Sequence, residues 1–472
     1  MKTQHKYKTI LIPFILAIIL IGTSCNQFLT QEPISDLTVS DFWKTPNDAK
    51  VGVIAIYSDF SKALASGLWD WGELRSDNFI SVQKESYDQK ELISNNIQID
   101  NNAALWTNLY STIQKANAAI KYIPRIAMTV SEKNSLLAEA YTLRAWSYFY
   151  CVRVWGDVPL YTDPVESVEQ GIYKKRTDKQ IILNLILTDL DNAYLLIDKT
   201  LVDRSRVNVA TICVLMMDVN AWLHNYDLVV KINEEKVSNL SSTKWGMTAL
   251  TAATFTADWR AMFIEDPLVA IPKEDLFKLS YDQLGNGENY AIKYFSSSEP
   301  YVNPSSKLMS IYGVKDLRKV QWEKIDAVTY ILDRKFWKNG TIFSGTGKIF
   351  SDNDLVLYRY ADIVLLYAEA LNAIDRKADA VNALNITRVR AGESAYLVTD
   401  FLSSDDLLDA ILLERQKEFL GEGKRWFDLV RTNRWQQVMY PINGMNDSRK
   451  ILFPIHRNHL IQNPELVQNP GY

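Results

Sequence analysis

The sequence predicts a mostly α-helical protein, and three observations lead to that prediction. Hydrophobic residues recur at helical spacing through two long stretches, about 47–240 and 354–435. Between them, residues 241–352 are rich in Ser, Gly, Asn and aromatic residues and contain few helical windows. The chain also begins with an apolar segment that has the pattern of an export signal. We therefore expect a helical scaffold interrupted by a loop-rich, irregular insertion.

The N-terminal segment indicates export and attachment to a lipid. Three lysines precede an apolar run over Ile10–Ile21, which is shorter than the roughly 20 residues that cross a bilayer. Small residues Gly22–Ser24 then lead into Cys25. This arrangement resembles the lipobox of bacterial lipoproteins, in which the cysteine becomes the acylated first residue, often carrying palmitate. We predict a signal peptide over 1–24, and the alternative is an ordinary secretory signal with an incidental cysteine.

Composition narrows the classes of partner. The chain has 472 residues and a formal net charge of −4, and it contains no basic run, so a nucleic-acid partner is not expected. Beyond Cys25 the only cysteines are Cys151 and Cys213, both in apolar, helix-like surroundings. We expect buried free thiols, although a disulfide outside the cell stays open.

The elements follow in order along the chain. Residues 25–46 are polar and contain two prolines, so they are expected to form a lipidated tether and a wrapping segment. Residues 47–472 are expected to form a single domain. Its helices are predicted from apolar spacing at 47–60, 103–123, 131–153, 178–196, 206–224, 226–235, 354–372, 377–391 and 405–419. Residues 436–472 are predicted to be a C-terminal docking tail.

The helix at 131–153 shows how these helices are expected to pack. Ser131 is a plausible N-cap, and Gly156 with Pro159 ends the helix. Alanines alternate with aromatic residues along it, which suits close helix pairs. Paired helices of this kind resemble tetratricopeptide packing.

Motifs in both halves of the chain resemble the SusD/RagB family of Bacteroidetes outer-membrane lipoproteins. The C-terminal third carries Tyr358–Asp362, Tyr367–Asn372, Arg390-Ala391-Gly392, Glu414-Arg415, Glu422–Leu429, Asn463-Pro464 and Gln468–Tyr472. The N-terminal half carries Leu74-x-Ser76-Asp77-Asn78, Trp106-x-x-x-Tyr110, Glu139–Ala145 and Gly156-Asp157-x-Pro159. The resemblance covers the whole mature chain. One departure is Pro454-Ile455-His456, where the family often has a second proline.

The resemblance implies a surface-exposed glycan-binding lipoprotein of the cell outer membrane. It implies capture of an oligosaccharide and a role as the lid of a SusC-like TonB-dependent barrel. A peptide- or glycoprotein-binding RagB-like member is the alternative, and a surface glycoside hydrolase is the alternative from another class. The tetratricopeptide-like helices are expected to serve as scaffold and partner surface, with ligand contacting the irregular part.

Glu414, Glu418 and Glu422 are spaced four residues apart and are expected to line one helix face as far as the helix extends. Glycosidase carboxylates flank a scissile bond from opposite sides of a cleft, so a single stripe beside Arg415 and Arg425 indicates structural ion pairs instead. In the same motif we expect Trp426 and Phe427 in the core and Gly423 as a helix stop.

The sequence indicates no catalytic residue, no cofactor and no metal. Gly345-Thr346-Gly347-Lys348 is followed by Ile349, where a phosphate-binding loop needs Ser or Thr. His456 and His459 are three residues apart, without a third ligand nearby in the sequence.

The ligand site is therefore predicted from aromatic residues and loops. Aromatic rings offer flat apolar surfaces to the C–H face of a sugar, and amide side chains bind its hydroxyl groups. The segment 281–322 is rich in tyrosine, and Tyr87 lies in a polar stretch between two predicted helices. The ligand-binding candidates are Tyr87, Asn289, Tyr290, Tyr294, Tyr301 and Trp322. Trp69 and Trp71, which precede the Leu74–Asn78 motif, are expected to be buried.

Overall fold

A computed structural model describes most of the chain from Phe42 to the C-terminus. The described ranges are 42–82, 86–167, 173–250, 273–281, 289–291, 294–295, 301–321, 323–324, 330–331 and 354–472, with single residues between 253 and 263. From Thr45 onward the chain forms one compact unit, which is described below. The predicted signal peptide, Cys25, Trp322 and Gly345–Lys348 lie outside the described residues.

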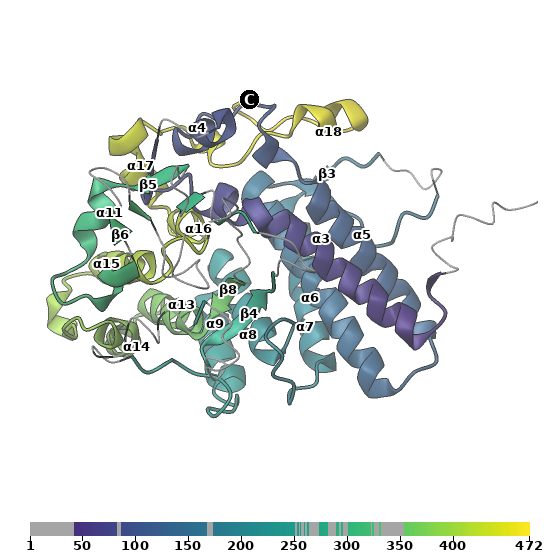
Figure 1. Cartoon of the computed structure of the whole chain (residues 1–472), viewed down its shortest axis with the longest axis horizontal. Coiled ribbons are helices and arrows are strands. Elements are labelled where there is room, and N and C mark those ends of the chain that lie inside the picture. Colours follow the sequence, from purple (N-terminus) through teal and green to yellow (C-terminus); the bar gives the residue numbers. More distant parts are fainter. Residues whose placement is uncertain are drawn as a thin grey trace, which may run out of the picture. The chain divides into compact units, whose positions relative to one another are not determined.

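The first part of this unit is a set of mostly long helices that are neighbours in sequence and in space. They are α3 (Pro46–Gly72), α5 (Thr107–Tyr122), α6 (Val130–Trp155), α7 (Lys179–Leu196), α8 (Val209–Trp222) and α9 (Tyr226–Ile232). Helix α3 packs on α5, α5 on α6 and α6 on α7 (Figure 1). The sequence starts α3 with Pro46 in its first turn and with a Thr45–Asp48 capping box. The cap of α6 is Thr129 rather than the predicted Ser131.

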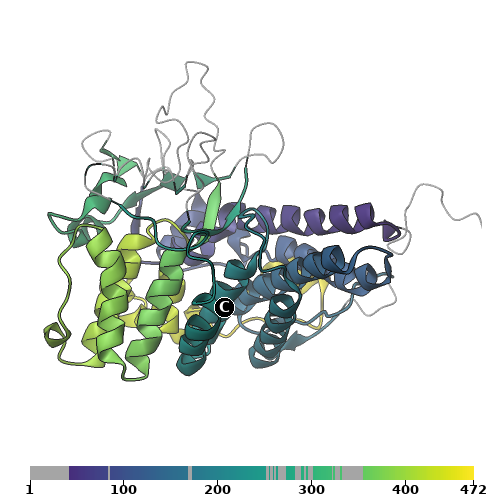
Figure 2. The same cartoon turned by 90° about the horizontal axis from the view of Figure 1, so that it is seen from below.

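A second set of helices continues the scaffold. It consists of α13 (Tyr360–Ala373), α14 (Lys377–Arg390), α15 (Ser404–Glu418), α16 (Arg425–Arg431), α17 (Trp435–Asn443) and α18 (Arg457–Gln462). Helix α13 packs on α14 and α15 and also on α8 and α9, so it joins the two sets. Figure 2 shows the green helices of this set, α13 to α15, side by side. The predicted mostly α-helical class with tetratricopeptide-like pairs is confirmed.

Short elements connect the helices. The strand pairs are antiparallel: β1 (Phe79–Ser81) with β5 (Val302–Pro304), β2 (Val158–Pro159) with β3 (Arg176–Thr177), β4 (Asp275–Leu279) with β8 (Leu355–Arg359), and β6 (Glu323–Lys324) with β7 (Tyr330–Ile331). Two short helices, α4 (Tyr87–Ile93) and α11 (Ser306–Ile311), flank them. In Figure 2 the described segments between residues 273 and 331 lie on one side of the helical scaffold.

The core is aromatic and holds both remaining cysteines. Trp69 and Trp71 are buried as predicted, and Trp71 packs edge-on against the buried Trp155. Cys151 and Cys213 are buried free thiols, which confirms that expectation. Burial raises the pKa of Cys213 to about 12, so the thiol stays protonated and unreactive at neutral pH. Among the described helices, none has the length and apolar character needed to cross a bilayer.

Candidate functional site

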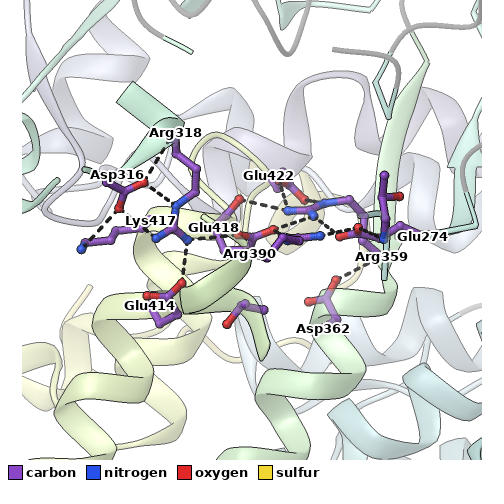
Figure 3. Close-up of polar contacts among 12 residues, drawn as sticks. Glu274, Asp316, Arg318, Arg359, Asp362, Arg390, Glu414, Lys417, Glu418 and Glu422 are labelled. Atoms are coloured by element: carbon purple, nitrogen blue, oxygen red, sulfur yellow. Dashed lines mark hydrogen bonds and ion pairs between the residues drawn. The ribbon is translucent and has the colours of Figure 1, made fainter. Parts of the chain in front are cut away.

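The acidic stripe, made of Glu414 and Glu418 on α15 and Glu422 in the turn after it, is the first arrangement that could carry chemistry (Figure 3). Because α15 ends at Glu418, Glu422 does not share its helix face. Arg318 donates to Glu414 at 2.8 Å and to Glu418 at 3.0 Å. Arg359 donates to Glu418 at 2.9 Å and to both Glu422 oxygens at 2.9 and 3.0 Å. All five side chains are buried. The three acids therefore form structural ion pairs, as the sequence predicted.

The partners differ from those suggested by sequence proximity. Arg415 donates to Asp428 at 2.8 Å and Arg425 donates to Asp77 at 2.9 Å, so neither pairs with the stripe. The pairing arginines come instead from β8, from α14 and from the η5 turn (Leu317–Gln321). Arg390 of α14 contacts Glu418 and donates to Glu274.

The network keeps its central acid ionised. Burial alone would raise the pKa of Glu418, but the guanidinium groups of Arg390, Arg359 and Arg318 outweigh it and hold that pKa well below its usual range. A glycosidase needs one carboxylic acid that remains protonated near neutral pH. Glu418 stays ionised instead, so its charge state suits a structural ion pair rather than a catalytic acid.

The two C-terminal histidines have structural contacts. His459 Nε2 accepts a hydrogen bond from the Trp106 backbone N–H at 3.2 Å, and His456 Nδ1 accepts from Asn458 at 3.1 Å. Burial and then His456 lower the pKa of His459 to about 4, so its ring is neutral at physiological pH. Within the described residues, no group of three His, Cys, Asp or Glu side chains is placed to hold a metal ion.

The predicted ligand residues separate into exposed and buried ones. Tyr87 is 77% exposed at the start of α4, Tyr290 is 41% exposed, and Tyr301 is half-buried. Tyr294 and Asn289 are 2% and 3% exposed. The structure brings Tyr290, Tyr294 and Tyr301 together: the Tyr294 N–H donates to the Tyr290 carbonyl at 3.3 Å, and the rings of Tyr294 and Tyr301 are 5.7 Å apart.

Burial contradicts the expectation that Tyr294 and Asn289 offer surface to a ligand. Tyr294 donates its hydroxyl to Asp70 at 2.6 Å, and its ring packs 5.2 Å from that of Trp69. Asn289 accepts from the Ala291 backbone N–H at 2.8 Å, so its amide shapes a local turn. Tyr294 thus attaches the insertion to α3, whereas Asn289 holds a turn within the insertion. Residue type and spacing alone did not distinguish these roles from ligand contact.

Tyr290 lies at an open hollow of about 750 Å³ between α3, the start of α5 and the insertion. This volume is typical of ligand sites, which occupy about 300–1,000 Å³. Three tyrosines line it together with small polar side chains: Tyr57, Tyr281, Tyr290, Ser58, Ser61, Asn108, Ser205 and Ser280, with Lys62 and Arg206 among the remaining lining residues.

The walls of this hollow are held in place by hydrogen bonds. Tyr281 donates to the Ser61 carbonyl at 3.2 Å, and Tyr57 accepts from the Val207 N–H at 2.8 Å. Arg206 forms a double hydrogen bond with Glu139 at 2.6 and 2.7 Å. Sequence reasoning had noted the tyrosine-rich segment but missed Tyr57, Asn108 and Arg206. They are far apart in the chain, and no local pattern marks them.

Comparisons with known proteins agree with this architecture. A family model described as the SusD family matches residues 292–472, and one described as starch-binding associating with outer membrane matches residues 70–216. SusD-like protein P38 of Formosa agariphila is 32% identical over 527 residues, which covers 99% of this chain and 100% of that protein.

Solved structures show the same fold. A SusD homolog from Bacteroides thetaiotaomicron VPI-5482 matches with a TM-score of 0.75 and 24% identity, covering 92% of this chain and 99% of that one. NanU of B. fragilis matches with a TM-score of 0.75 and 21% identity, covering 93% and 99%. At these identities the likeness establishes the fold alone.

Proposed function

This chain belongs to the SusD/RagB family, and we propose that it binds an extracellular oligosaccharide at the hollow beside Tyr290 without cleaving it. The observation that carries the proposal is the composition of that hollow: three tyrosine rings beside serine hydroxyls and the Asn108 amide. Aromatic faces bind the apolar C–H surface of a sugar ring, and hydroxyl and amide groups orient its rim. The matched family description, starch-binding associating with outer membrane, supports a glycan as the ligand.

The same proposal includes transport. The chain acts as the lid of a SusC-like TonB-dependent barrel in the cell outer membrane, faces the cell exterior, and passes the captured glycan inward. The paired helices supply a rigid scaffold and the surface for the barrel. Co-purification with such a barrel from native membranes tests this part, and a chain that runs alone where other such pairs survive extraction contradicts it.

Attachment to the membrane is proposed to occur through lipid at Cys25 only. A single acyl chain binds membranes weakly, so firm attachment requires the several chains of a bacterial lipoprotein. Replacing Cys25 by Ala is expected to release the protein from the membrane fraction or to block its processing. Fractionation of cells and surface proteolysis measure this, and unchanged membrane association of Cys25→Ala contradicts it.

Calorimetry with a panel of oligosaccharides tests ligand binding. The soluble chain after Cys25 is expected to bind one glycan with a Kd on the order of micromolar to millimolar, or about −8 to −4 kcal/mol. Tyr290→Ala is expected to weaken binding about tenfold with an unchanged melting temperature, because an exposed ring contributes contact rather than core packing. Tyr87, Tyr301 and Trp322 remain proposed contacts and are tested in the same way.

Tyr440→Ala is the matched control, because Tyr440 is 58% exposed on α17 and does not line the hollow. Equal loss of affinity in both variants would contradict the assignment of the site. Binding of peptides but of no glycan would favour the RagB-like alternative. Release of reducing sugar, abolished by a single carboxylate substitution, would establish a hydrolase and refute the proposal.

A further inference from the structure

A second, smaller hollow of about 210 Å³ lies between the start of α5, the β2–β3 pair and α18. These elements are adjacent in Figure 1, where α18 is at the C-terminal, yellow end of the colour bar. Its lining is dominated by aromatic rings. Trp106 directly precedes α5 and Tyr110 belongs to α5, while Tyr161 follows β2 and Tyr173 precedes β3. Gln462 and Asn463 contribute amide groups at the end of α18.

The aromatic wall is built before any ligand arrives. Trp106 stacks on His459 with ring centroids 4.8 Å apart and an angle of 16° between the planes, and its backbone N–H donates to the same imidazole. Tyr110 donates its hydroxyl to the Pro159 carbonyl at 2.6 Å and meets Tyr161 edge-on at 6.1 Å. A wall fixed in this way loses little conformational freedom when a ligand binds.

The entrance of the hollow carries side chains that are available to a ligand. Tyr173 is 53% exposed and Gln462 is also exposed. Neither side chain has a hydrogen-bond partner within the part of the chain that the structure describes. An exposed aromatic ring beside an uncommitted amide is the combination that binds a sugar ring and its hydroxyl groups.

The charge of the lining restricts the chemistry of the ligand. None of the lining side chains carries a charge near neutral pH, since the pKa of His459 is lowered to about 4. The volume is below the roughly 300 Å³ at which sites for drug-sized ligands begin, so the hollow has room for one ring. A proline-rich peptide in an extended helix needs an aromatic groove that accepts successive residues, which a single small hollow does not provide.

We propose that this hollow is a second glycan-binding site that takes one uncharged sugar ring between Tyr173, Trp106 and Gln462. The inference rests on the proposed function, because it assigns a further contact to the same class of ligand. Asn108 lines the first hollow and Tyr110 the second. Residues two apart on a helix face different sides, so the two sites bind separate parts of a glycan. Linked binding at both sites would strengthen capture of a long chain over a short one.

The test uses the full chain, labelled with fluorotryptophan and held in a detergent that has no sugar headgroup. Methyl glycosides of glucose, galactose and mannose are titrated while fluorine NMR follows the Trp106 signal, which is assigned by its loss in Trp106→Phe. At least one glycoside is expected to shift that signal with a Kd on the order of 1 to 10 mM. Tyr173→Ala and Gln462→Ala are each expected to weaken this binding about fivefold to tenfold.

Two controls separate the sites. Ile461→Ala changes a 73% exposed residue of α18 that does not line the hollow, and it is expected to leave the titration unchanged. Tyr290→Ala is also expected to leave the Trp106 shift unchanged, because it alters the first hollow only.

Three outcomes would overturn the inference: no shift with any glycoside, the same affinity in Tyr173→Ala, or a shift caused only by a proline-rich peptide. If the Tyr290-dependent binding of an oligosaccharide persists in those cases, the second site alone is refuted. If no glycan binds at either hollow, the proposed function falls as well.

Discussion

Asp70 is the residue at which α3 holds the aromatic insertion. Its carboxylate is buried and accepts the Tyr294 hydroxyl at 2.6 Å. Burial, aided by the negative charge of Asp88, raises the pKa of Asp70 to about 7, although the hydrogen bonds from Tyr294 and Ser66 oppose the shift. The insertion is thus attached through an acid that is only partly ionised at neutral pH.

This raised pKa predicts a stability that depends on pH. The folded protein disfavours the ionised form of Asp70, so the free energy of unfolding is highest below the unfolded-state pKa of about 4 and falls as pH rises to about 7. Asp70→Asn removes this cost and keeps an oxygen acceptor for Tyr294. It is expected to raise the free energy of unfolding by about 2 to 4 kcal/mol at pH 8 and to change it little at pH 4. Urea unfolding at both pH values measures the difference, and an equal effect at both would contradict the assignment.

Trp426 is the second residue whose role can be tested directly. Its side chain is 1% exposed, and the buried guanidinium of Arg75 lies 4.3 Å from its ring centroid. Trp426→Ala is expected to destabilise the fold by about 3 to 5 kcal/mol because it leaves a large cavity. Glycan affinity of the folded fraction should be unchanged. A stable variant that had lost binding would overturn the structural assignment of this motif.

Gly423 shows a limit of sequence reasoning at the same scale. It was expected to stop a helix, but α15 already ends at Glu418. Gly423 has φ +71°, and a Cβ there would lie 2.4 Å from the Leu68 carbonyl oxygen. Its backbone is needed for close approach to α3, and such a contact between distant segments leaves no local pattern.

At the scale of elements, helical spacing predicted the existence of the helices better than their ends. Helix α3 was expected to end at residue 60 but continues to Gly72. Gly67 and Gly72 disfavour helix by their conformational freedom, yet Leu64, Leu68 and Trp69 keep the buried face continuous. Tertiary packing outweighs the local cost of glycine in this case.

The shared helix face of Glu414 and Glu418 was predictable from spacing, whereas the partners of these acids were not. Arg318 and Arg359 precede Glu418 by 100 and 59 residues, and only the folded chain brings them together. The same reason explains the candidate site. Tyr290 could be selected from a tyrosine-rich stretch, but Tyr57 of α3 and Arg206, which precedes α8, reach its hollow from distant parts of the chain.

Removing one member of this network is expected to be costly. Glu418→Gln leaves buried arginines without their shared counter-charge and should destabilise the fold by about 3 to 5 kcal/mol at neutral pH. Because the folded state lowers the pKa of Glu418, this contribution is fully present above the unfolded-state pKa of about 4.5 and is lost progressively as pH falls toward the folded-state pKa. The difference between variant and parent should therefore shrink near pH 3 in urea unfolding.

Glu234→Gln is the matched control for that measurement. Glu234 also pairs with an arginine, Arg376, at 2.7 Å, but both side chains are about half exposed at 45% and 40%. Such surface pairs contribute about 0 to 1 kcal/mol. Equal losses in Glu418→Gln and Glu234→Gln would contradict the special role of the buried network.

At the scale of the whole molecule, residues in and next to the motifs of the two halves bind each other. Trp69 donates to the Gly421 carbonyl at 2.8 Å, and Glu73 accepts from the Gly423 N–H at 3.0 Å. Arg75 donates to the carbonyls of Lys450 and Ile451. The two matched family regions, 70–216 and 292–472, thus meet at a buried polar seam. The motifs that suggested the family thus stabilise the fold. Because they do not line the candidate ligand site, they did not reveal it.

The ion pair between Asp77 and Arg425 tests whether this seam makes the two halves unfold together. The residues are 348 positions apart, with an oxygen–nitrogen distance of 2.9 Å, and Asp77 is fully buried in its side chain. Asp77→Asn should cost about 3 to 5 kcal/mol, because it leaves the buried Arg425 without its counter-charge. Arg425→Gln should cost less, because Asp77 keeps its ion pair with the half-exposed Lys307 at 3.1 Å. The double variant should cost clearly less than the sum of the two, since it leaves neither charge behind. Tryptophan fluorescence and circular dichroism should report one coincident urea transition in every variant. Additive losses of stability would contradict coupling between Asp77 and Arg425. A variant in which one half unfolds before the other would show that the halves are stable separately and that the seam does not make them unfold together.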